Sequence, residues 1–181
     1  MLLVDVDGPL NPYAAKPHRR PEGYGTHRIL TPRWKAAERR RLAERGMPGR
    51  TVRPLRVWLD PAHGPALRAL PFDLVWATTW EEEANTYIGP VLGLPELPFI
   101  AWSGQRAEPG DGDGVFWKTP EVVAWARGRA FAWVDDEVTE ADREWVQRHH
   151  AGPALLHRVD PRRGLTGEDF AALAAWAARV R

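Results

Sequence analysis

Acidic side chains follow two apolar segments of the chain, at the point where each segment ends. Asp5 and Asp7 come after the run "MLLV", separated by a single valine. Asp135 and Asp136 come directly after the run "AFAWV". Alternation along an extended chain places Asp5 and Asp7 on the same side, and carboxylates held so close repel each other unless a cation lies between them. Because Mg²⁺ prefers oxygen ligands of this kind, the pattern indicates a magnesium site; the simpler alternative is that the acids only cap the turns that follow.

Hydroxyl and amine side chains complete the set of groups that could bind a phosphoryl group. Thr78 and Thr79 end the apolar run "DLVWA", and hydroxyl groups can hydrogen-bond phosphoryl oxygens. Lys118 is one of only three lysines and stands directly before the pair Thr119-Pro120, which is typical of a helix start. An ammonium group there could neutralise an aspartate and a phosphoryl oxygen together. The alternative for Lys118 is a solvated lysine ahead of a helix.

The elements that must position these residues alternate between apolar strand patterns and helical patterns. Five strands of one sheet are expected over residues 1–6, 73–78, 97–102, 130–134 and 154–159. Helices are expected over residues 32–45, 61–70, 80–93, 121–128, 140–150 and 167–180, and residues 26–30 and 55–59 are expected to pair as a hairpin. The alternation predicts an α/β fold with a mainly parallel five-stranded sheet and helices on both faces. Ligands of such sheets bind beyond the carboxyl ends of the strands, where the acids and threonines lie.

Two helix starts carry a specific capping signal. Thr139 is followed three residues later by Asp142, and Thr166 by Asp169. A hydroxyl followed at this spacing by an acid resembles the capping box, in which each side chain satisfies the backbone N–H of the other residue. The helices over 140–150 and 167–180 are therefore expected to begin directly after these threonines.

Composition sets broad limits on the function. The chain has 181 residues, and 44% hydrophobic with 27% charged residues is typical of one globular domain over 1–181. Cysteine is absent, so no disulfide-linked partner and no thiolate metal site is expected. No apolar stretch approaches the roughly 20 residues of a membrane helix and no signal pattern begins the chain, so the expectation is a cytoplasmic protein without a membrane partner. The tryptophans within apolar strands are expected in the core: Trp58, Trp76, Trp102 and Trp133.

A basic segment interrupts the strand and helix pattern. Between Lys16 and Arg56 there are 13 Lys and Arg residues against three acids, while the whole chain has a net charge of only +1. Such a segment can face a polyanion, and the alternative is a solvated arginine-rich helix. We expect residues 11–57 to form a flap with a basic insertion.

The order of the polar residues along the chain resembles the haloacid dehalogenase (HAD) superfamily of phosphohydrolases. "DVDGPL" resembles its first motif, "VWATTW" its second, Lys118 its third and "WVDDE" its fourth. The resemblance covers nearly the whole chain except the basic segment. More narrowly, "DVDG…LNP", "ATTW" and "FAWVDDE" are similar to the HAD domains of some Swiss-army-knife RNA-repair proteins. The resemblance implies a three-layer Rossmann-like HAD fold in which the segment 11–57 replaces a large cap.

The resemblance also implies a role for each motif residue. Asp5 is the expected nucleophile, and Asp7 the expected general acid and base. Thr78 is expected to bind a phosphoryl oxygen, and Lys118 to hold the nucleophile and stabilise developing charge. The expected cofactor is Mg²⁺, held by Asp5, by Asp7 through its backbone carbonyl, and by Asp135 or Asp136, of which Asp135 is favoured.

Further residues are candidates for contact with the substrate, and they lie within the motifs or in the basic segment: Gly8, Thr79, Trp80, Arg19, Arg20 and His27. The chain departs from the family pattern at Pro9, where the family usually has threonine, so one backbone N–H is missing beside the site. In this family, a small cap or none often goes with macromolecular substrates.

The expected function is a Mg²⁺-dependent phosphatase that acts through an aspartyl-phosphate on phosphate monoesters. Because Asp7 supplies an acid that the carbon–halogen-cleaving members lack, phosphate esters are expected, with nucleic-acid ends and nucleotides as the substrates to test first. One alternative is a non-catalytic nucleic-acid-binding module on the same scaffold. A phospho-acceptor domain like the bacterial receivers is disfavoured by the order of the residues. Receivers carry the acid pair first, the phosphorylated aspartate on a later strand and the lysine last, whereas here Lys118 precedes Asp135 and Asp136.

Overall fold

The computed structural model describes residues 1–104 and 114–180, and these contain six strands and seven helices. The strands are β1 (Leu2–Val4), β2 (Gly25–Ile29), β3 (Leu55–Leu59), β4 (Leu74–Trp76), β5 (Phe131–Asp135) and β6 (Ala154–Arg158). The helices are α1 (Pro32–Glu44), α2 (His63–Ala69), α3 (Glu82–Tyr87), α4 (Gly89–Leu92), α5 (Thr119–Ala126), α6 (Glu140–His149) and α7 (Gly167–Arg179).

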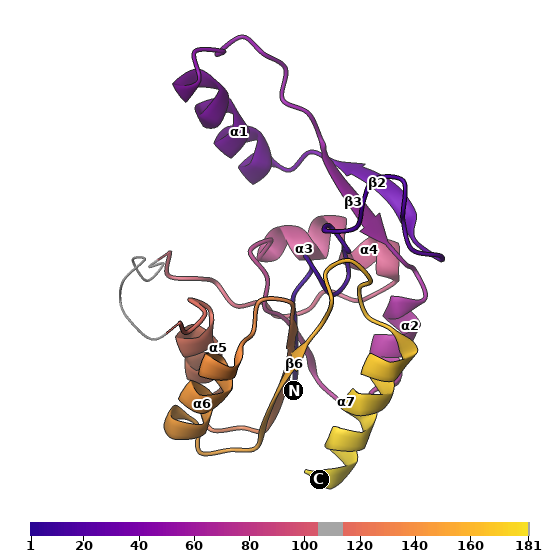
Figure 1. The fold of residues 1–181 in the computed structure, drawn as a ribbon, viewed down its shortest axis with the longest axis vertical. Coiled ribbons are helices and arrows are strands. Elements are labelled where there is room, and N and C mark those ends of the chain that lie inside the picture. Colours follow the sequence, from indigo (N-terminus) through magenta and orange to yellow (C-terminus); the bar gives the residue numbers. More distant parts are fainter. Residues whose placement is uncertain (105–113, 181) are drawn as a thin grey trace.

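Four strands form a parallel sheet in the spatial order β4-β1-β5-β6 (Figure 1). Within it β1 and β5 are direct neighbours, with Val4 opposite Val134. Because β4 lies on one side of β1 and β5 on the other, the direction in which successive strands are added reverses beside β1. This reversal is the place where open α/β sheets bind ligands, beyond the carboxyl ends of the strands. The arrangement is a mixed α/β fold that is compatible with a Rossmann-like fold.

The expected fifth strand over residues 97–102 is wrong. In its place Phe99 forms one isolated parallel bridge with Trp76 at the outer edge of β4. The N–H of Trp76 donates to the carbonyl of Pro98 at 2.9 Å, and the N–H of Ile100 donates to the carbonyl of Trp76 at 2.9 Å. Because Pro98 has no N–H and Pro95 precedes it in the same segment, the chain cannot extend this pairing into a strand.

Helices cover both faces of the sheet and complete three layers, with α5 and α6 on one side and α2 and α7 on the other (Figure 1). On one face Leu2 belongs to a buried cluster with Leu173 of α7. On the other face Leu3 belongs to a second cluster with Val122 of α5 and Val146 of α6. Successive side chains of a strand point to opposite faces, so a strand buried on both sides must be apolar throughout. This explains why the sheet segments appear in the sequence as continuous apolar runs.

Both predicted capping boxes are confirmed. The hydroxyl groups of Thr139 and Thr166 donate to Asp142 Oδ2 and Asp169 Oδ2 at 2.8 Å and 2.7 Å, and the backbone N–H of each threonine donates to the same oxygen at 2.7 Å. They open α6 and α7 as expected.

The single helix expected over residues 80–93 is wrong, because two short helices, α3 and α4, occupy that segment. Pro90 lies in the first turn of α4 and has no N–H to continue the hydrogen bonding of α3, so the helix breaks between them.

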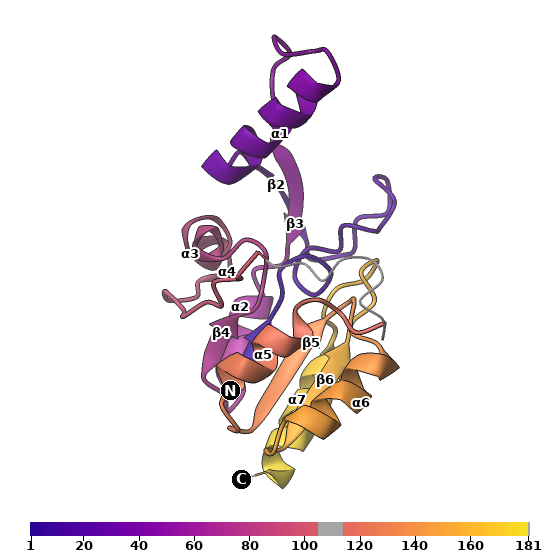
Figure 2. The same cartoon turned by 90° about the vertical axis from the view of Figure 1, so that its left-hand side faces the viewer.

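The hairpin predicted in the basic segment is confirmed. β2 pairs antiparallel with β3, from Gly25 opposite Leu59 to Ile29 opposite Leu55. α1 follows β2, and its first turn is capped by the Thr31 hydroxyl, which accepts the N–H of Trp34 at 3.0 Å. We call residues 25–59 the arm. Figures 1 and 2 show that α1 projects from the far end of the hairpin, away from the sheet.

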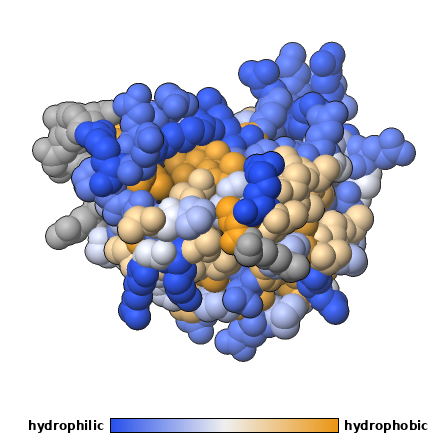
Figure 3. Space-filling view, turned by 90° about the horizontal axis from the view of Figure 1, so that it is seen from below, coloured by the Kyte–Doolittle hydropathy of each residue, from blue (hydrophilic) through white to orange (hydrophobic). Residues whose placement is uncertain are grey.

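The opposite end of the molecule is seen in Figure 3, where apolar patches lie in the middle of the face and hydrophilic residues surround them. Among the described residues no helix combines the length and the apolar character that crossing a bilayer requires. Trp58, Trp76 and Trp133 are buried as expected, whereas Trp102 is only partly buried.

Candidate active site

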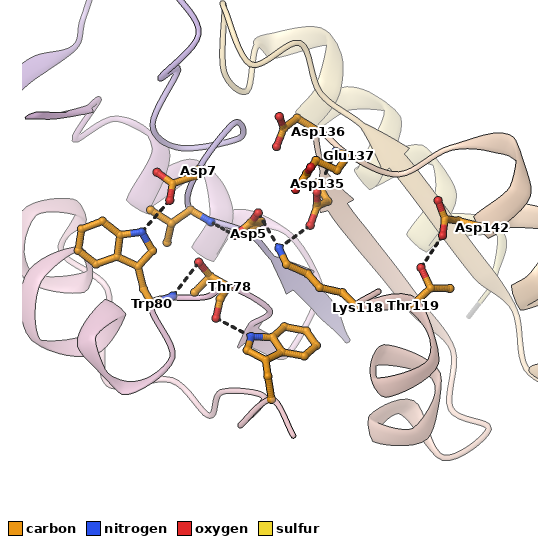
Figure 4. A network of polar contacts seen from close by, with 12 residues as sticks. Asp5, Asp7, Thr78, Trp80, Lys118, Thr119, Asp135, Asp136, Glu137 and Asp142 are labelled. Carbon is orange, nitrogen blue, oxygen red and sulfur yellow. Dashed lines mark hydrogen bonds and ion pairs between the residues drawn. The ribbon is translucent and has the colours of Figure 1, made fainter. Parts of the chain in front are cut away.

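Lys118 stands at the centre of a buried cluster of charges at the carboxyl ends of β1 and β5 (Figure 4). Its Nζ donates to Asp5 Oδ2 at 2.8 Å and to Asp135 Oδ2 at 2.9 Å. Asp5 directly follows β1 and Asp135 ends β5, so the pairing of these strands brings the two carboxylates together. Burial alone would lower the pKa of the Lys118 ammonium, but Asp5 and Asp135 more than offset this effect and raise its pKa above the ordinary value. The two carboxylates therefore favour the charged form of Lys118.

Three carboxylates of this cluster lie close enough together that they could hold a metal ion. Asp5, Asp135 and Asp136 each offer an oxygen, and these oxygens lie within 4.8 Å of one another. Burial and the adjacent Asp5 raise the pKa of Asp135 well above its ordinary value, and burial is the main cause that raises the pKa of Asp136 to about 6. With all three carboxylates ionised, the single ammonium of Lys118 would leave an excess of negative charge. A divalent cation would remove this excess, so the all-oxygen donor set fits Mg²⁺.

Asp136 is held in place by groups from distant parts of the chain. The Tyr13 hydroxyl donates to Asp136 Oδ2 at 3.0 Å, and Arg158 Nε donates to its backbone carbonyl at 3.1 Å. Gly8 adopts a φ of +95°, and a Cβ at this position would lie 2.2 Å from Asp136 Oδ1. The structure thus gives a reason for glycine at position 8 that the sequence does not show, namely room for the Asp136 carboxylate. Its contact with a substrate remains a prediction.

The carboxylate of Asp7 points away from the three grouped acids (Figure 4). Asp7 Oδ1 accepts the side-chain N–H of Asn11 at 2.7 Å, and Oδ2 accepts the indole N–H of Trp80 at 2.9 Å. Burial and the neighbouring Asp5 raise the pKa of Asp7, against the effect of these two donors. A raised pKa suits a group that must hold a proton before it gives it to a leaving group. The Asp7 side chain is not one of the three grouped carboxylates, and the expected role of its backbone carbonyl remains a prediction.

Thr78 reaches the same rim from β4. The N–H of Ala77 donates to the carbonyl of Val4 at 2.9 Å, so the ends of β4 and β1 lie side by side. Thr78 is fully buried, and its backbone carbonyl accepts the indole N–H of Trp102 at 2.8 Å. The pairing of β1 with β4 and β5 thus brings Thr78, Asp5 and Asp135 to one end of the sheet.

Asp142 supports the site, and the sequence identified only its capping role. The carboxylate is fully buried, and its Oδ1 accepts the Thr119 hydroxyl at 2.6 Å and the N–H of Phe116 at 2.7 Å. Both donors lie within two residues of Lys118. Asp142 therefore joins α6 to the segment that carries the lysine. The capping-box signal located this aspartate, but nothing local indicates its second set of partners.

A cavity of about 520 Å³ lies beside Asp7, between the arm and the carboxyl end of the sheet. Thr79 and Trp80, two of the predicted substrate contacts, line it, and their contact with a substrate remains a prediction. The other predicted contacts in the basic segment are not among its lining residues: Arg19, Arg20 and His27. Arg20 instead donates to the Thr26 hydroxyl at 2.9 Å and lines a separate basic cleft. The arm supplies Arg33 and Arg56 to the cavity in their place.

Arg33 ties the arm to the body of the molecule. Its guanidinium donates to the carbonyl of Thr79 at 2.9 Å and forms an ion pair with Glu81, and its backbone N–H donates to Glu83 at 3.1 Å. These contacts hold the start of α1 against the start of α3. No local sequence pattern indicates these contacts, because the partners are about 50 residues apart.

Comparisons with protein-family models, with curated proteins and with solved structures found no match to this chain. The function is therefore argued from the geometry of the site.

Proposed function

We propose that the protein is a Mg²⁺-dependent phosphatase that hydrolyses phosphate monoesters through an aspartyl-phosphate on Asp5. The observation that carries the proposal is the single ammonium of Lys118 bonded to both Asp5 and Asp135, within a group of three buried carboxylates at the reversal of the sheet. A second acid, Asp7, faces the adjoining cavity.

The chain's own residues divide the reaction between them. An Asp5 oxygen attacks phosphorus, and the bond from phosphorus to the ester oxygen breaks as Asp7 gives its proton to that oxygen. In the second half, Asp7 takes a proton from the water that attacks phosphorus. The bond between phosphorus and Asp5 then breaks and inorganic phosphate leaves.

Lys118 and Thr78 assist both halves. Lys118 holds the Asp5 carboxylate in position and offsets negative charge on the phosphoryl oxygens. The Thr78 hydroxyl would donate to one of those oxygens. Asp5 with Asp135 and Asp136 would hold Mg²⁺, which when bound reduces the repulsion between the attacking carboxylate and the phosphate dianion.

The test is phosphate release from p-nitrophenyl phosphate, nucleotides and 3′- or 5′-phosphorylated oligonucleotides, with and without Mg²⁺. Asp5→Asn keeps the shape of the side chain but removes the nucleophile, so we expect activity to fall about 1,000-fold or more. Asp73→Asn is the matched control, because Asp73 is an exposed acid directly before β4, at the other end of the sheet. Activity that Asp5→Asn leaves unchanged, or that needs no divalent ion, would refute the proposal.

The second candidate function is a non-catalytic nucleic-acid-binding module, and the arm is the observation that favours it. α1 carries consecutive exposed arginines, Arg39, Arg40 and Arg41, on the part of the molecule that projects from the body (Figure 1). This candidate predicts oligonucleotide binding that weakens steeply with salt, survives Asp5→Asn and is lost when the three arginines become alanine, with no phosphate release from any ester.

A further inference from the structure

Four tryptophans from different parts of the chain line the cavity beside Asp7: Trp34, Trp80, Trp102 and Trp117. We call this space the aromatic cavity. We propose that it binds the base of a nucleotide whose phosphate monoester reaches Asp5. This inference rests on the proposed function, because Asp7 is both the expected acid for the leaving group and a wall of the aromatic cavity.

Three of the four indole N–H groups of the aromatic cavity donate hydrogen bonds within the protein. Trp34 Nε1 donates to the carbonyl of Arg53 at 2.9 Å, Trp80 Nε1 to Asp7 at 2.9 Å and Trp102 Nε1 to the carbonyl of Thr78 at 2.8 Å. These three side chains can therefore contact a ligand through their ring surfaces but not through their indole N–H groups. A flat, polarisable ring gains most from such surfaces, because aromatic rings stack favourably on one another.

The charged groups around the aromatic cavity fit a neutral ring better than a further anion. Arg33 is paired with Glu81, and Glu83 also lines the space. Arg56 lies over the Trp58 ring, with its guanidinium carbon 4.1 Å from the ring centroid. The lining has three acids, Asp7, Glu81 and Glu83, against two arginines, so it has no excess of positive charge that would attract a further anion. The attraction for phosphate lies instead at Lys118 and the proposed metal site.

Hydrogen-bonding groups in the wall favour a nucleobase over a plain hydrocarbon ring. One Glu83 oxygen accepts the backbone N–H of Arg33 at 3.1 Å, and a carboxylate has about four acceptor sites, so it can accept further donors. The N–H groups of a base can meet such an acceptor, while a phenyl ring has none to offer. A cavity of about 520 Å³ also lies within the size range of small-molecule sites.

The experiment compares nucleoside monophosphates with the matching ribose phosphates, which have the same phosphoester but no base. Binding to Asp5→Asn in the presence of Mg²⁺ is measured by calorimetry, so that turnover does not interfere. We expect the nucleotide to bind roughly 5- to 150-fold more tightly, the factor that corresponds to about 1–3 kcal/mol per stacked base. The nucleotide should also quench tryptophan fluorescence, whereas the ribose phosphate should not. Equal affinities or equal quenching would overturn the inference.

Variants of Trp34 locate the effect, because this residue lies on α1 of the arm and is not one of the three grouped acids. In the Asp5→Asn background, Trp34→Leu should reduce the preference for the nucleotide by about 5-fold or more, and Trp34→Phe should retain most of it because a ring remains. Trp145→Leu is the matched control, because Trp145 is a partly buried tryptophan of α6 that stacks on His149 and does not line the cavity. If Trp34→Leu does not fold, the quenching measurement above still decides the question.

Two further results separate this inference from the proposed function. Preference for the nucleotide without phosphate release from any ester would support the cavity assignment and refute the phosphatase. Equal phosphate release from nucleotide and ribose phosphate, with equal affinities, would support the phosphatase and refute the cavity assignment. Tighter binding of phosphotyrosine than of every nucleotide would overturn the assignment to a base.

Discussion

Lys118 is the only cation that contacts both Asp5 and Asp135 in the described part of the chain, so its removal tests the electrostatics of the whole site. Lys118→Met keeps most of the side-chain volume and removes the charge. The side chains involved are almost fully buried, with exposed fractions of 3% for Lys118, 7% for Asp5 and 0% for Asp135. Solvent therefore cannot replace the ammonium.

The magnitude follows from the cost of leaving buried charges unpaired. Removal of one partner from a buried ion pair typically costs about 3–5 kcal/mol. We expect the free energy of unfolding to fall by about 3–5 kcal/mol near pH 7.5 without metal, which in a domain of this size lowers the melting temperature by roughly 6–20 °C. Lys35→Met, on the exposed face of α1, should change the free energy of unfolding by less than about 0.5 kcal/mol.

The pH dependence of this loss has a definite sign. Without Lys118, the pKa of Asp135 in the folded state rises further above that of the unfolded chain, because the ammonium that now lowers it is gone. The folded variant then binds more protons than the unfolded one, so its stability increases as the pH falls, and the penalty shrinks towards about pH 5. Mg²⁺ should restore more stability to the variant than to the original protein, because it supplies the missing positive charge.

The assay is urea unfolding followed by circular dichroism, at several pH values, with EDTA or with Mg²⁺. A loss below about 1 kcal/mol, or one that does not depend on pH, would show that the three carboxylates do not rely on Lys118. The charge arrangement behind the proposed function would then be wrong.

Three further predictions concern other residues. Gly8→Ala should weaken Mg²⁺ binding in calorimetry and lower stability by about 1–3 kcal/mol, because the new Cβ would meet Asp136 Oδ1, whereas Gly49→Ala, which has open space around it, should do neither. Asp142→Asn should lower the unfolding free energy by about 1–3 kcal/mol and reduce phosphate release, since a charged acceptor of four donors becomes neutral; full stability would contradict its supporting role. Burial lowers the pKa of His63. The unfolded chain therefore takes up a proton near about pH 6.5 that folded His63 does not, and stability should decrease as the pH falls from about 7 to 5. In His63→Gln, this part of the dependence of the unfolding free energy on pH should disappear in urea unfolding. An unchanged dependence would show that a group other than His63 causes it.

Local signals explain why much of the fold could be predicted. The capping boxes at Thr139 and Thr166 depend on residues three apart, and the hairpin of β2 and β3 depends on two short strand patterns. The errors arose where proline overrode an apolar pattern. Pro98 reduced an expected strand to one bridge, and Pro90 divided an expected helix.

The sequence by itself determined which chemical groups stand at the ends of the strands, because the apolar runs and the acids that follow them are contiguous in the chain. Only the tertiary structure decided that Asp5, Asp135 and Asp136 share one space, since this depends on the pairing of β1 with β5.

The tertiary structure alone also decided that Asp7 turns towards Trp80 and that tryptophans from α1 and from the loops line one cavity. The direction of a side chain and the shape of a cavity depend on packing between segments far apart in the sequence. Local patterns of a few residues do not determine that packing. They therefore predict which groups form a site but not the shape of the space that those groups enclose.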